Sequence, residues 1–378
     1  MKKFLCTVLS TVLAMSSAAA LNMSAYADSA NTQQVSYNYW YNSSTGYTDE
    51  NVHTRQMEKL DRGLIAIKTD GGVYLSWRLF DSEDNIFGSA DKNVSFNVYR
   101  DGKKISEVAT KTNYVDSTVG KNYSVAPVIN GVEGEKCNAV TVYNNSYFDI
   151  PLLKPDDETI YDPSGTELAT YSFFPVDCST GDVDGDGEYE IIVKWTSSEH
   201  DVGSPGDPAY SGTVHLAAYK LDGTKLWKND IALGKNVYSS AHTVQFLVYD
   251  FDGDGKSEVI CQTSLGSKDG QGKYVSNAAQ TDEEIKAITD EENSTADYRG
   301  YGRITEGKEF LTVFNGETGV AMDTINLPTT RGSENGVDYG DDFGNRSNRF
   351  VSDIAYLDGE KPYAIYLRGY YFGRNGKQ

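Results

Sequence analysis

Apolar and polar residues alternate along most of this chain, and the 3.6-residue period of a helix is almost absent. The stretch GLIAIKTDGGVYLSWRLF (63–80) carries two alternating runs around a Thr-Asp-Gly-Gly turn, which predicts a β-hairpin. VSFNVYRDGKKISEVA (94–109) repeats the pattern around Asp101-Gly102. Short strands at this spacing predict a β-sandwich of the fibronectin type III kind over residues 55–147. Only TDEEIKAITDEEN (281–293) fits a short helix.

A repeat begins after the proline-bearing linker PLLKPDDETIYDP (151–163). In each copy an acidic, glycine-rich turn leads into an apolar strand and then into a hairpin with a tight turn. The copies and turns are GDVDGDGEYEIIVKW (181–195) with the hairpin turn 221–224, YDFDGDGKSEVICQTS (249–264) with the turn 315–319, and a degenerate third start, IAYLDGEKPYAIYL (354–367). Such repetition is typical of propeller blades. We therefore predict an all-β protein with a sandwich followed by a partial β-propeller over residues 148–378.

The amino-terminal residues have the features of an export signal. Two lysines precede a largely apolar run, and Ala25-Tyr26-Ala27 supplies the small-residue pattern of a cleavage site, so residues 1–27 are predicted to be a secretory signal peptide. The alternative is a retained membrane anchor, but the apolar run is short and is interrupted by Ser and Thr. Residues 28–54 lack a sustained period and are predicted to be a flexible leader. The mature chain is therefore expected to be secreted, with no membrane partner.

The chain has 378 residues, with 34 Lys plus Arg against 55 Asp plus Glu and a net charge of −21. This acidity excludes a nucleic-acid partner held by phosphate contacts. Aromatic residues make up 12% of the chain, which is enough material for packed cores and excludes wholesale disorder. Once the signal is removed, Cys137, Cys178 and Cys261 remain, an odd and scattered set that argues against a disulfide framework.

The acidic turns of the first two repeats share the pattern D-x-D-x-D-G-x-x-E, which we interpret as calcium-binding loops. Alternating carboxylates converge on one centre, glycine permits the sharp reversal, and the carbonyl at the seventh position completes the loop. The last acid stands at position nine and not at twelve, so strand–loop–strand sites fit better than EF-hands. One match could be an ordinary acidic turn, whereas two matches at equivalent places in a repeat favour metal binding. Mg2+ is disfavoured, because its stricter octahedral site retains water and rarely uses so many side chains. The predicted metal residues are Asp182, Asp184, Asp186, Glu188, Glu190, Asp250, Asp252, Asp254, Lys256 and Glu258.

Other candidate functional residues have an ordinary structural interpretation of equal or greater weight. His242 ends a predicted strand and is as easily a buried, hydrogen-bonded histidine as a functional one. Arg331, Arg346 and Arg349 lie in a Gly- and Asp-rich stretch that is either a solvated loop or an anion-binding wall. Trp195 follows the core pattern of the other tryptophans, although its place at a strand end also suits contact with a sugar ring.

The order of several motifs makes the chain resemble the secreted rhamnogalacturonan lyases of polysaccharide lyase family 11. The resemblance spans about residues 54–371. It is carried by TRQMEKLDRGLIAIKTDGGVYLSWR (54–78), STGDVDGDGEYEIIVKW (179–195), AHTVQFLVYDFDGDGKSEV (241–259), FGNRSNRF (343–350) and AYLDGEKPYAIYLRGYY (355–371). It implies a sandwich followed by an eight-bladed, calcium-rich propeller that cleaves the rhamnose–galacturonate backbone of the pectic polysaccharide rhamnogalacturonan I.

The chain departs from this family in two respects. Family members continue well beyond residue 378, so the catalytic residues are expected there and this chain alone is expected to be inactive or impaired, unless a second chain completes the propeller. The family also places Asn and Asp along the substrate groove where this chain has Val176 and Thr196. These two residues and Trp195 are the predicted substrate-binding positions.

The implied reaction is β-elimination, in which a base removes the C5 proton of galacturonate and positive charge stabilises the resulting anion. Within this chain His242, Arg331, Arg346 and Arg349 are the candidate contributors, while the two acidic loops are assigned to structure. The rival hypothesis is a non-catalytic, calcium-stabilised propeller for glycan binding or adhesion.

Overall fold

The computed structural model describes residues 56–80, 83, 93–109, 111–161, 164–197, 212–234, 237, 239, 243–276, 283, 308–330, 339–340 and 346–369. The predicted signal peptide and leader, most of the predicted helix at 281–293, His242 and Arg331 lie outside these residues. Within the part that is described, no helix is long and apolar enough to cross a membrane.

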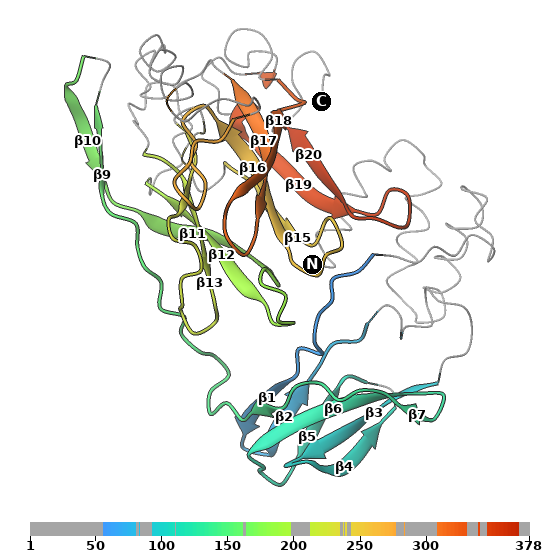
Figure 1. Cartoon of the computed structure of the whole chain (residues 1–378). Helices are drawn as coiled ribbons and strands as arrows, with labels where there is room; N and C mark the ends of the chain where they lie inside the picture. The colour runs from blue at the N-terminus through green and yellow to red at the C-terminus, as the bar shows by residue number, and fades with distance from the viewer. Residues whose placement is uncertain are drawn as a thin grey trace. The chain divides into compact units, whose positions relative to one another are not determined.

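The chain divides into two compact units, of which the first contains Leu64–Asn144. This unit is two antiparallel sheets whose inner faces share one core (Figure 1). One sheet has the order β1-β2-β5 and the other the order β4-β3-β6-β7, with β8 also pairing with β6. The strands are β1 (Ile65–Thr69), β2 (Gly72–Ser76), β3 (Val94–Arg100), β4 (Lys103–Val108), β5 (Asn113–Asp116), β6 (Asn122–Ile129), β7 (Val132–Glu133) and β8 (Val140–Thr141).

Alternation along these strands explains how the first unit packs. Leu75 of β2 and Val98 of β3 are fully buried, and Trp77 meets Phe96 edge-on with ring centroids 5.5 Å apart. The predicted turn at 101–102 joins β3 to β4, with both residues at positive φ. The predicted hairpin around residues 69–72 is confirmed as β1 and β2, and so is the turn at 101–102.

The second unit combines Arg55–Gly63 with the chain from Asn145 onward. A two-stranded sheet, β9–β10, precedes two four-stranded sheets, β11–β14 and β15–β18, and a final hairpin, β19–β20. The strands are β9 (Glu158–Tyr161), β10 (Glu167–Tyr171), β11 (Phe174–Gly181), β12 (Glu190–Thr196), β13 (His215–Tyr219), β14 (Ile231–Ala232), β15 (Phe246–Tyr249), β16 (Glu258–Ser264), β17 (Glu309–Asn315), β18 (Ala321–Asn326), β19 (Phe350–Ala355) and β20 (Tyr363–Arg368).

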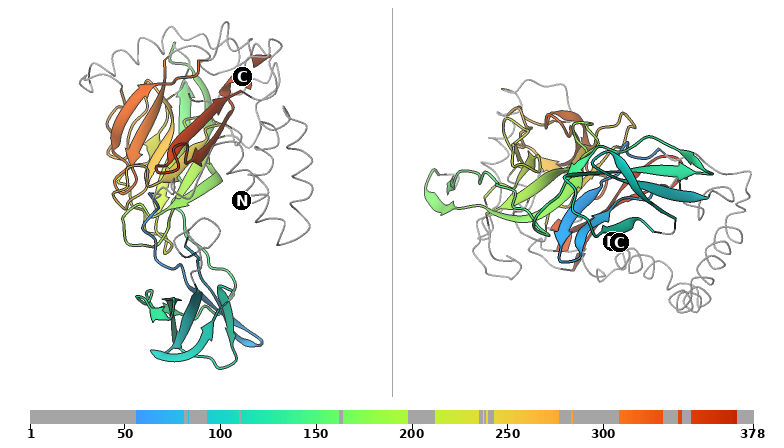
Figure 2. Two further views of the ribbon diagram at one scale, coloured as in Figure 1. Left: turned by 90° about the vertical axis from the view of Figure 1, so that its right-hand side faces the viewer. Right: turned by 90° about the horizontal axis from the view of Figure 1, so that it is seen from below.

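The predicted repeat is visible as three successive antiparallel sheets. In the two four-stranded sheets the strands follow one another in chain order, and the third start forms the hairpin β19–β20. Figures 1 and 2 show the three sheets side by side, and the first strand of the second sheet, β15, contacts both β11 and β19. The all-β class is therefore confirmed.

Apolar residues between the first two of these sheets form their shared core. Ile192 and Leu216 of the first sheet pack with Val259 and Phe314 of the second. Trp227 joins the same core, and its indole N–H donates to the carbonyl of Gly316 at 2.7 Å. This packing holds the two acidic loops, which connect β11 to β12 and β15 to β16, on neighbouring sheets.

Candidate metal centre and groove edge

The first acidic loop folds around the carboxylate of Asp182, directly after β11. Its two oxygens accept the backbone N–H groups of Gly185 at 2.7 Å and Gly187 at 2.8 Å. Both glycines have positive φ, 82° and 90°, a region that L side chains rarely adopt. At the start of β12, Glu190 Oε2 accepts the N–H of Val183 at 3.0 Å. The loop therefore curls so that its acids face inward.

The second acidic loop has the same pattern of hydrogen bonds. The carboxylate of Asp250 accepts the N–H groups of Gly253 at 2.6 Å and Gly255 at 3.0 Å, and these glycines have φ of 82° and 91°. Glu258 Oε2 accepts the N–H of Phe251 at 2.9 Å. Equivalent residues of the two copies thus make equivalent hydrogen bonds.

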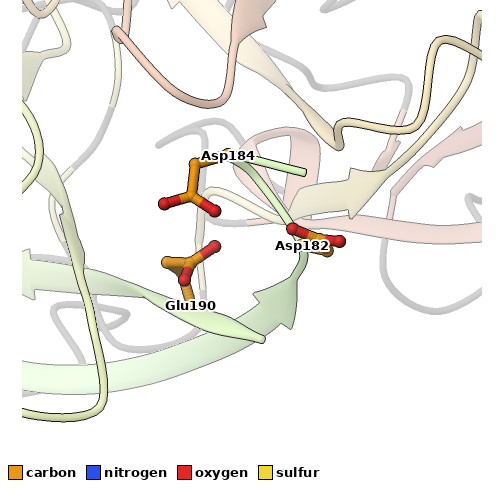
Figure 3. Close-up of side chains that lie close together, drawn as sticks. All are labelled: Asp182, Asp184 and Glu190. Carbon is orange, nitrogen blue, oxygen red and sulfur yellow. The ribbon is translucent and has the colours of Figure 1, made fainter. Parts of the chain in front are cut away.

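Each loop brings three carboxylates together. Oxygens of Asp182, Asp184 and Glu190 lie within 4.8 Å of one another, and Figure 3 shows the side chains of Asp184 and Glu190 facing each other beside Asp182. In the second loop the residues within the same 4.8 Å are Asp250, Asp252 and Asp254. Asp186 and Glu258 lie outside these clusters, and the roles predicted for the carbonyls of Glu188 and Lys256 stay predictions.

Burial and like charge raise the pKa values of the acids in both loops. Burial, reinforced by the charges of the neighbouring aspartates, raises the pKa of Glu190 to about 7 and that of Glu258 to about 7. The pKa values of Asp182 and Asp250 are also raised, in both cases mainly by burial. Crowded hard oxygen ligands suit Ca2+, and a divalent cation would relieve the repulsion that raises these pKa values. The residues present therefore fit a calcium ion.

Two lysine side chains lie at the loops. The sequence did not single out Lys220, and for Lys256 it predicted only a carbonyl that binds the metal. Lys220, directly after β13, places Nζ 2.5 Å from Asp184 Oδ2 and 3.3 Å from Asp186 Oδ2. Lys256, within the second loop, directs Nζ to Glu317 Oε2 at 2.5 Å. The available signal was a lysine immediately before the Leu-Asp-Gly-Thr hairpin turn of the first repeat.

Residues 56–61, here called the strap, cross the ends of the repeats within the second unit. The amide of Gln56 donates to the carbonyl of Phe251 at 3.1 Å, next to the second loop. The backbone N–H of Gln56 donates to the carbonyl of Glu360 at 2.7 Å, in the turn of the third repeat. No periodicity in the sequence indicated this role.

The strap also contacts the first loop. Glu58 accepts hydrogen bonds from Tyr189 Oη and from Ser257 Oγ, both at 3.3 Å, so one carboxylate joins the ends of both loops. The N–H of Asp61 donates to the carbonyl of Gly187 at 3.1 Å. A short segment that precedes the sandwich in sequence therefore ties all three repeats together.

The predicted groove residues occupy three different environments at the β11–β12 edge. Val176 is half-buried at an irregularity in the pairing of β11 with β12, between Pro175 and Asp177. Such bulges are frequent beside functional sites. Thr196 is fully buried, with no hydrogen-bond partner for Oγ1. Trp195 is 3% exposed and packs in a core cluster, which supports its structural interpretation over contact with a sugar.

Lys194 is a buried cation next to this edge that the sequence did not single out. Its Nζ donates to the carbonyls of Thr243 at 2.9 Å and Val244 at 3.3 Å, and it lies 3.7 Å from Asp177 Oδ2. Burial lowers the pKa of Lys194. Val244 has φ of 58°, a strained conformation for a β-branched residue. The lysine thus holds a strained segment just before β15.

Arg346 and Arg349 are half-buried and lie at a short 3-10 turn, η4 (Arg346–Asn348), before β19. Arg346 Nη1 donates to the carbonyl of Gly340 at 3.2 Å. The turn is held by Arg368, whose Nε donates to the carbonyl of Ser347 at 2.5 Å. These contacts fit a positioned loop.

Arg368 is itself part of a buried ion pair. Its two terminal nitrogens bind both carboxylate oxygens of Glu309 on β17, at 2.7 and 3.0 Å. Gln262 on β16 donates to the same carboxylate at 2.8 Å.

Cys137, Cys178 and Cys261 are free cysteines, in agreement with the predicted absence of a disulfide framework among the described residues.

Comparison with known families matches both units. Residues 147–375 match "Rhamnogalacturonan lyase family 11, C-terminal domain", and residues 55–143 match "Rhamnogalacturonan I lyases beta-sheet domain".

Two curated proteins of Bacillus subtilis (strain 168) are similar in sequence. The rhamnogalacturonan endolyase YesW is 46% identical over 321 residues, which cover 84% of this chain and 46% of YesW. The rhamnogalacturonan exolyase YesX is 42% identical over 323 residues, covering 84% of this chain and 47% of YesX. The chain thus spans about half the length of the curated relatives it matches.

Solved structures give the same result. The crystal structure of YesW matches with a TM-score of 0.67 and 45% identity, covering 84% of this chain and 49% of that chain. A Bacillus licheniformis rhamnogalacturonan lyase matches with a TM-score of 0.67 and 45% identity, covering 84% of this chain and 50% of that chain. YesX matches with a TM-score of 0.66 and 40% identity, covering 84% of this chain and 48% of that chain.

Proposed function

Because this chain belongs to rhamnogalacturonan lyase family 11, we propose that it acts in the cleavage of rhamnogalacturonan I by β-elimination. The observation that carries the proposal is the family match over residues 147–375, together with 46% identity to a rhamnogalacturonan endolyase. The bond that breaks is C4–O4 of galacturonate: the C5 proton is removed, O4 departs with the preceding rhamnose, and the galacturonate becomes a 4,5-unsaturated uronate. The pectic polysaccharide is the proposed partner.

The proposed architecture is a β-sandwich followed by blades of a calcium-stabilised propeller. Three antiparallel sheets in chain order, with β15 in contact with β11 and β19, support this arrangement. The two acidic loops are the proposed calcium sites, with Asp182, Asp184 and Glu190 as ligands in the first. We propose an extracellular location on the basis of the signal-like residues 1–27.

Elimination requires positive charge beside the uronate carboxylate, because the anion formed at C5 must be stabilised. A chain with a net charge of −21 repels a polyuronate at long range, so cations must gather locally at the groove. Arg346 and Arg349 are the described residues proposed for that wall, and His242 and Arg331 complete the set by sequence. Bound calcium would hold the loop that joins β11 to β12, the two strands on which the groove-edge residues lie.

The direct test is incubation of the purified chain with rhamnogalacturonan I while the ultraviolet absorbance of the unsaturated product is followed. An increase supports elimination, and the length of the first products separates internal cleavage from release at chain ends. Homogalacturonan, which lacks rhamnose, is the control substrate. Polysaccharide binding without any rise in absorbance would favour the glycan-binding alternative for this chain.

Val176 and Thr196 give a second test of the proposed groove edge. The double variant Val176→Asn/Thr196→Asp introduces the residues that the family places there. Its turnover should be higher than that of the wild-type chain. Thr196 is fully buried, so Thr196→Val, which keeps the shape of the side chain and removes its hydroxyl, shows whether a change in the double variant comes from packing and not from the new carboxylate. Equal turnover of all variants would remove these positions from the substrate site.

A further inference from the structure

The two acidic loops have the same pattern of backbone hydrogen bonds but differ in the lysine that lies beside them. In the first loop the Lys220 ammonium lies 2.5 Å from Asp184 Oδ2 and 3.3 Å from Asp186 Oδ2. Asp184 is one of the three clustered carboxylates, so the ammonium touches a group proposed to bind the metal ion. The positive charge of a side chain thus already lies at the edge of the site.

This lysine has no counterpart in the second repeat. The strand registers make Tyr219 of β13 and Phe314 of β17 equivalent, which places Asn315 where the first repeat has Lys220. The Asn315 side chain accepts a hydrogen bond from the N–H of Thr318 at 2.9 Å, within its own hairpin turn. It brings no charge to the second loop.

The lysine of the second loop points away from the clustered acids. Lys256 forms its ion pair with Glu317 at 2.5 Å. Among the residues the structure describes, no lysine or arginine forms an ion pair with Asp250, Asp252 or Asp254. The three clustered carboxylates of the second loop therefore have no ion-pair partner among the described lysines and arginines, and the charge of Lys256 acts on Asp254 only at longer range.

The position of Lys220 is set by its backbone. Its N–H donates to the carbonyl of Thr224 at 2.9 Å, and its carbonyl accepts the N–H of Gly223 at 2.9 Å, so the hairpin turn presents the side chain to the loop. The Lys220 side chain is 35% exposed and that of Asp184 is 17% exposed, so solvent screens the pair only in part.

We infer that Lys220 is a built-in counter-cation that makes the first loop the weaker of two unequal calcium sites and keeps it folded when no ion is bound. The inference rests on the calcium sites proposed above. An ion entering the first loop meets an ammonium that already neutralises Asp184 and Asp186, and two positive charges at this range repel each other. In the second loop an ion meets carboxylates only.

Calorimetric titration of the full chain with Ca2+ tests the inference directly. We expect two sites whose dissociation constants differ by about tenfold, equivalent to about 1.4 kcal/mol. The variant Lys220→Met, which keeps the length of the side chain and removes its charge, should strengthen the weaker site by about tenfold. Lys220→Arg should behave as the wild type, and Lys228→Met, at an exposed lysine of the same repeat outside both loops, should leave both constants unchanged.

The site that changes is identified in a background in which Asp252→Asn weakens the second loop. There Lys220→Met should still strengthen the remaining site, and in an Asp182→Asn background it should have no effect on the remaining, second site. The melting temperature in EGTA is an independent measurement: Lys220→Met should lower it, because the acids of the first loop lose their counter-charge.

Three outcomes would overturn the inference. Equal constants in the wild type, unchanged affinity in Lys220→Met, or weaker binding in that variant would each show that Lys220 does not compete with the ion. Absence of any calcium binding in the wild type would instead remove the proposed calcium sites themselves. None of these measurements uses the polysaccharide assay, so a failure of the lyase proposal is recognised separately.

Discussion

The first and second acidic loops show which features a sequence repeat determines and which depend on neighbouring residues. Asp182 and Asp250 each accept two glycine N–H groups, and the same nine-residue pattern gives the same curled backbone. The surroundings differ, because Lys220 reaches into the first loop whereas Lys256 turns away from the second. Equal local structure therefore coexists with unequal electrostatics.

The difference teaches that a motif defines a site but its neighbours set the strength of that site. Each loop has a lysine that pairs with an acid: Lys220, in the turn after β13, pairs with acids of the first loop, whereas Lys256, within the second loop, pairs with Glu317 outside that loop. A search for D-x-D-x-D-G alone would rate the two loops as equal.

Removal of calcium should lower the melting temperature of the second unit and leave that of the first unit unchanged. Each proposed ion contributes about 2.7 kcal/mol at a hundredfold excess over its dissociation constant, so two ions should raise the melting temperature of a unit of this size by roughly 10 °C or more. Scanning calorimetry with and without EGTA measures the effect. The sandwich, in which the described residues contain no acidic cluster, serves as the internal control. If EGTA moves no transition, the metal assignment is wrong.

The metal-free chain should lose stability as the pH rises from about 4.5 to about 7. The pKa of Glu258 is 4.5 as a free group and about 7 in the folded chain, mainly because the group is buried. The folded state therefore holds a proton that the unfolded state releases, so this contribution is complete below pH 4.5 and disappears as the pH passes 7. Its size is on the order of 3 kcal/mol.

Melting in EGTA across this pH range, for the wild type, Glu258→Gln and Glu190→Gln, tests the titration. Each substitution should flatten the slope, since glutamine cannot titrate. Lys220 lowers the pKa of Glu190, so removing its charge should steepen the slope through the first loop and leave the second loop as it was. A flat wild-type profile would contradict the raised pKa values.

The variant Glu58→Ala should loosen both loops at once. Its carboxylate accepts hydrogen bonds from Tyr189 and Ser257, so its loss should cost about 1–2 kcal/mol of unfolding free energy in urea. Double-mutant cycles with Tyr189→Phe and Ser257→Ala divide that cost between the two loops. Lys59→Ala, at the exposed neighbouring position, is the matched control. Additive effects in both cycles would mean that the strap does not join the loops.

The variant Glu317→Gln should have the smallest effect. The ion pair between Lys256 and Glu317 is more than one-third exposed on both sides, and such surface pairs contribute less than about 1 kcal/mol. Chemical denaturation should show a change near the error of the method, whereas Lys220→Met in EGTA should show a clear loss. A larger effect of Glu317→Gln would mean that Lys256 supports the second loop through its partner.

Local sequence determined much of the fold. The turn at Asp101-Gly102, the hairpins at 221–224 and 315–319, and both curled loops depend on glycines and short polar residues within a few positions of each other. Alternating residues likewise indicated the core positions Phe96 and Val98 of β3, although Ser95 and Asn97 on its other face are buried as well. These features need no information from distant parts of the chain, which is why the all-β class was predictable.

Stacking of the sheets decided the rest. Lys220 reaches an acid 34 residues earlier, and Glu58 binds Ser257 across 199 residues, so neither contact leaves a local pattern. Burial of Trp195 at a strand end also depends on the residues that pack over it. The sequence by itself determined where carboxylates gather, because that requires only a short loop. Which cations and hydrogen bonds surround those carboxylates was decided by the tertiary structure, since these partners come from separate sheets that only folding brings together.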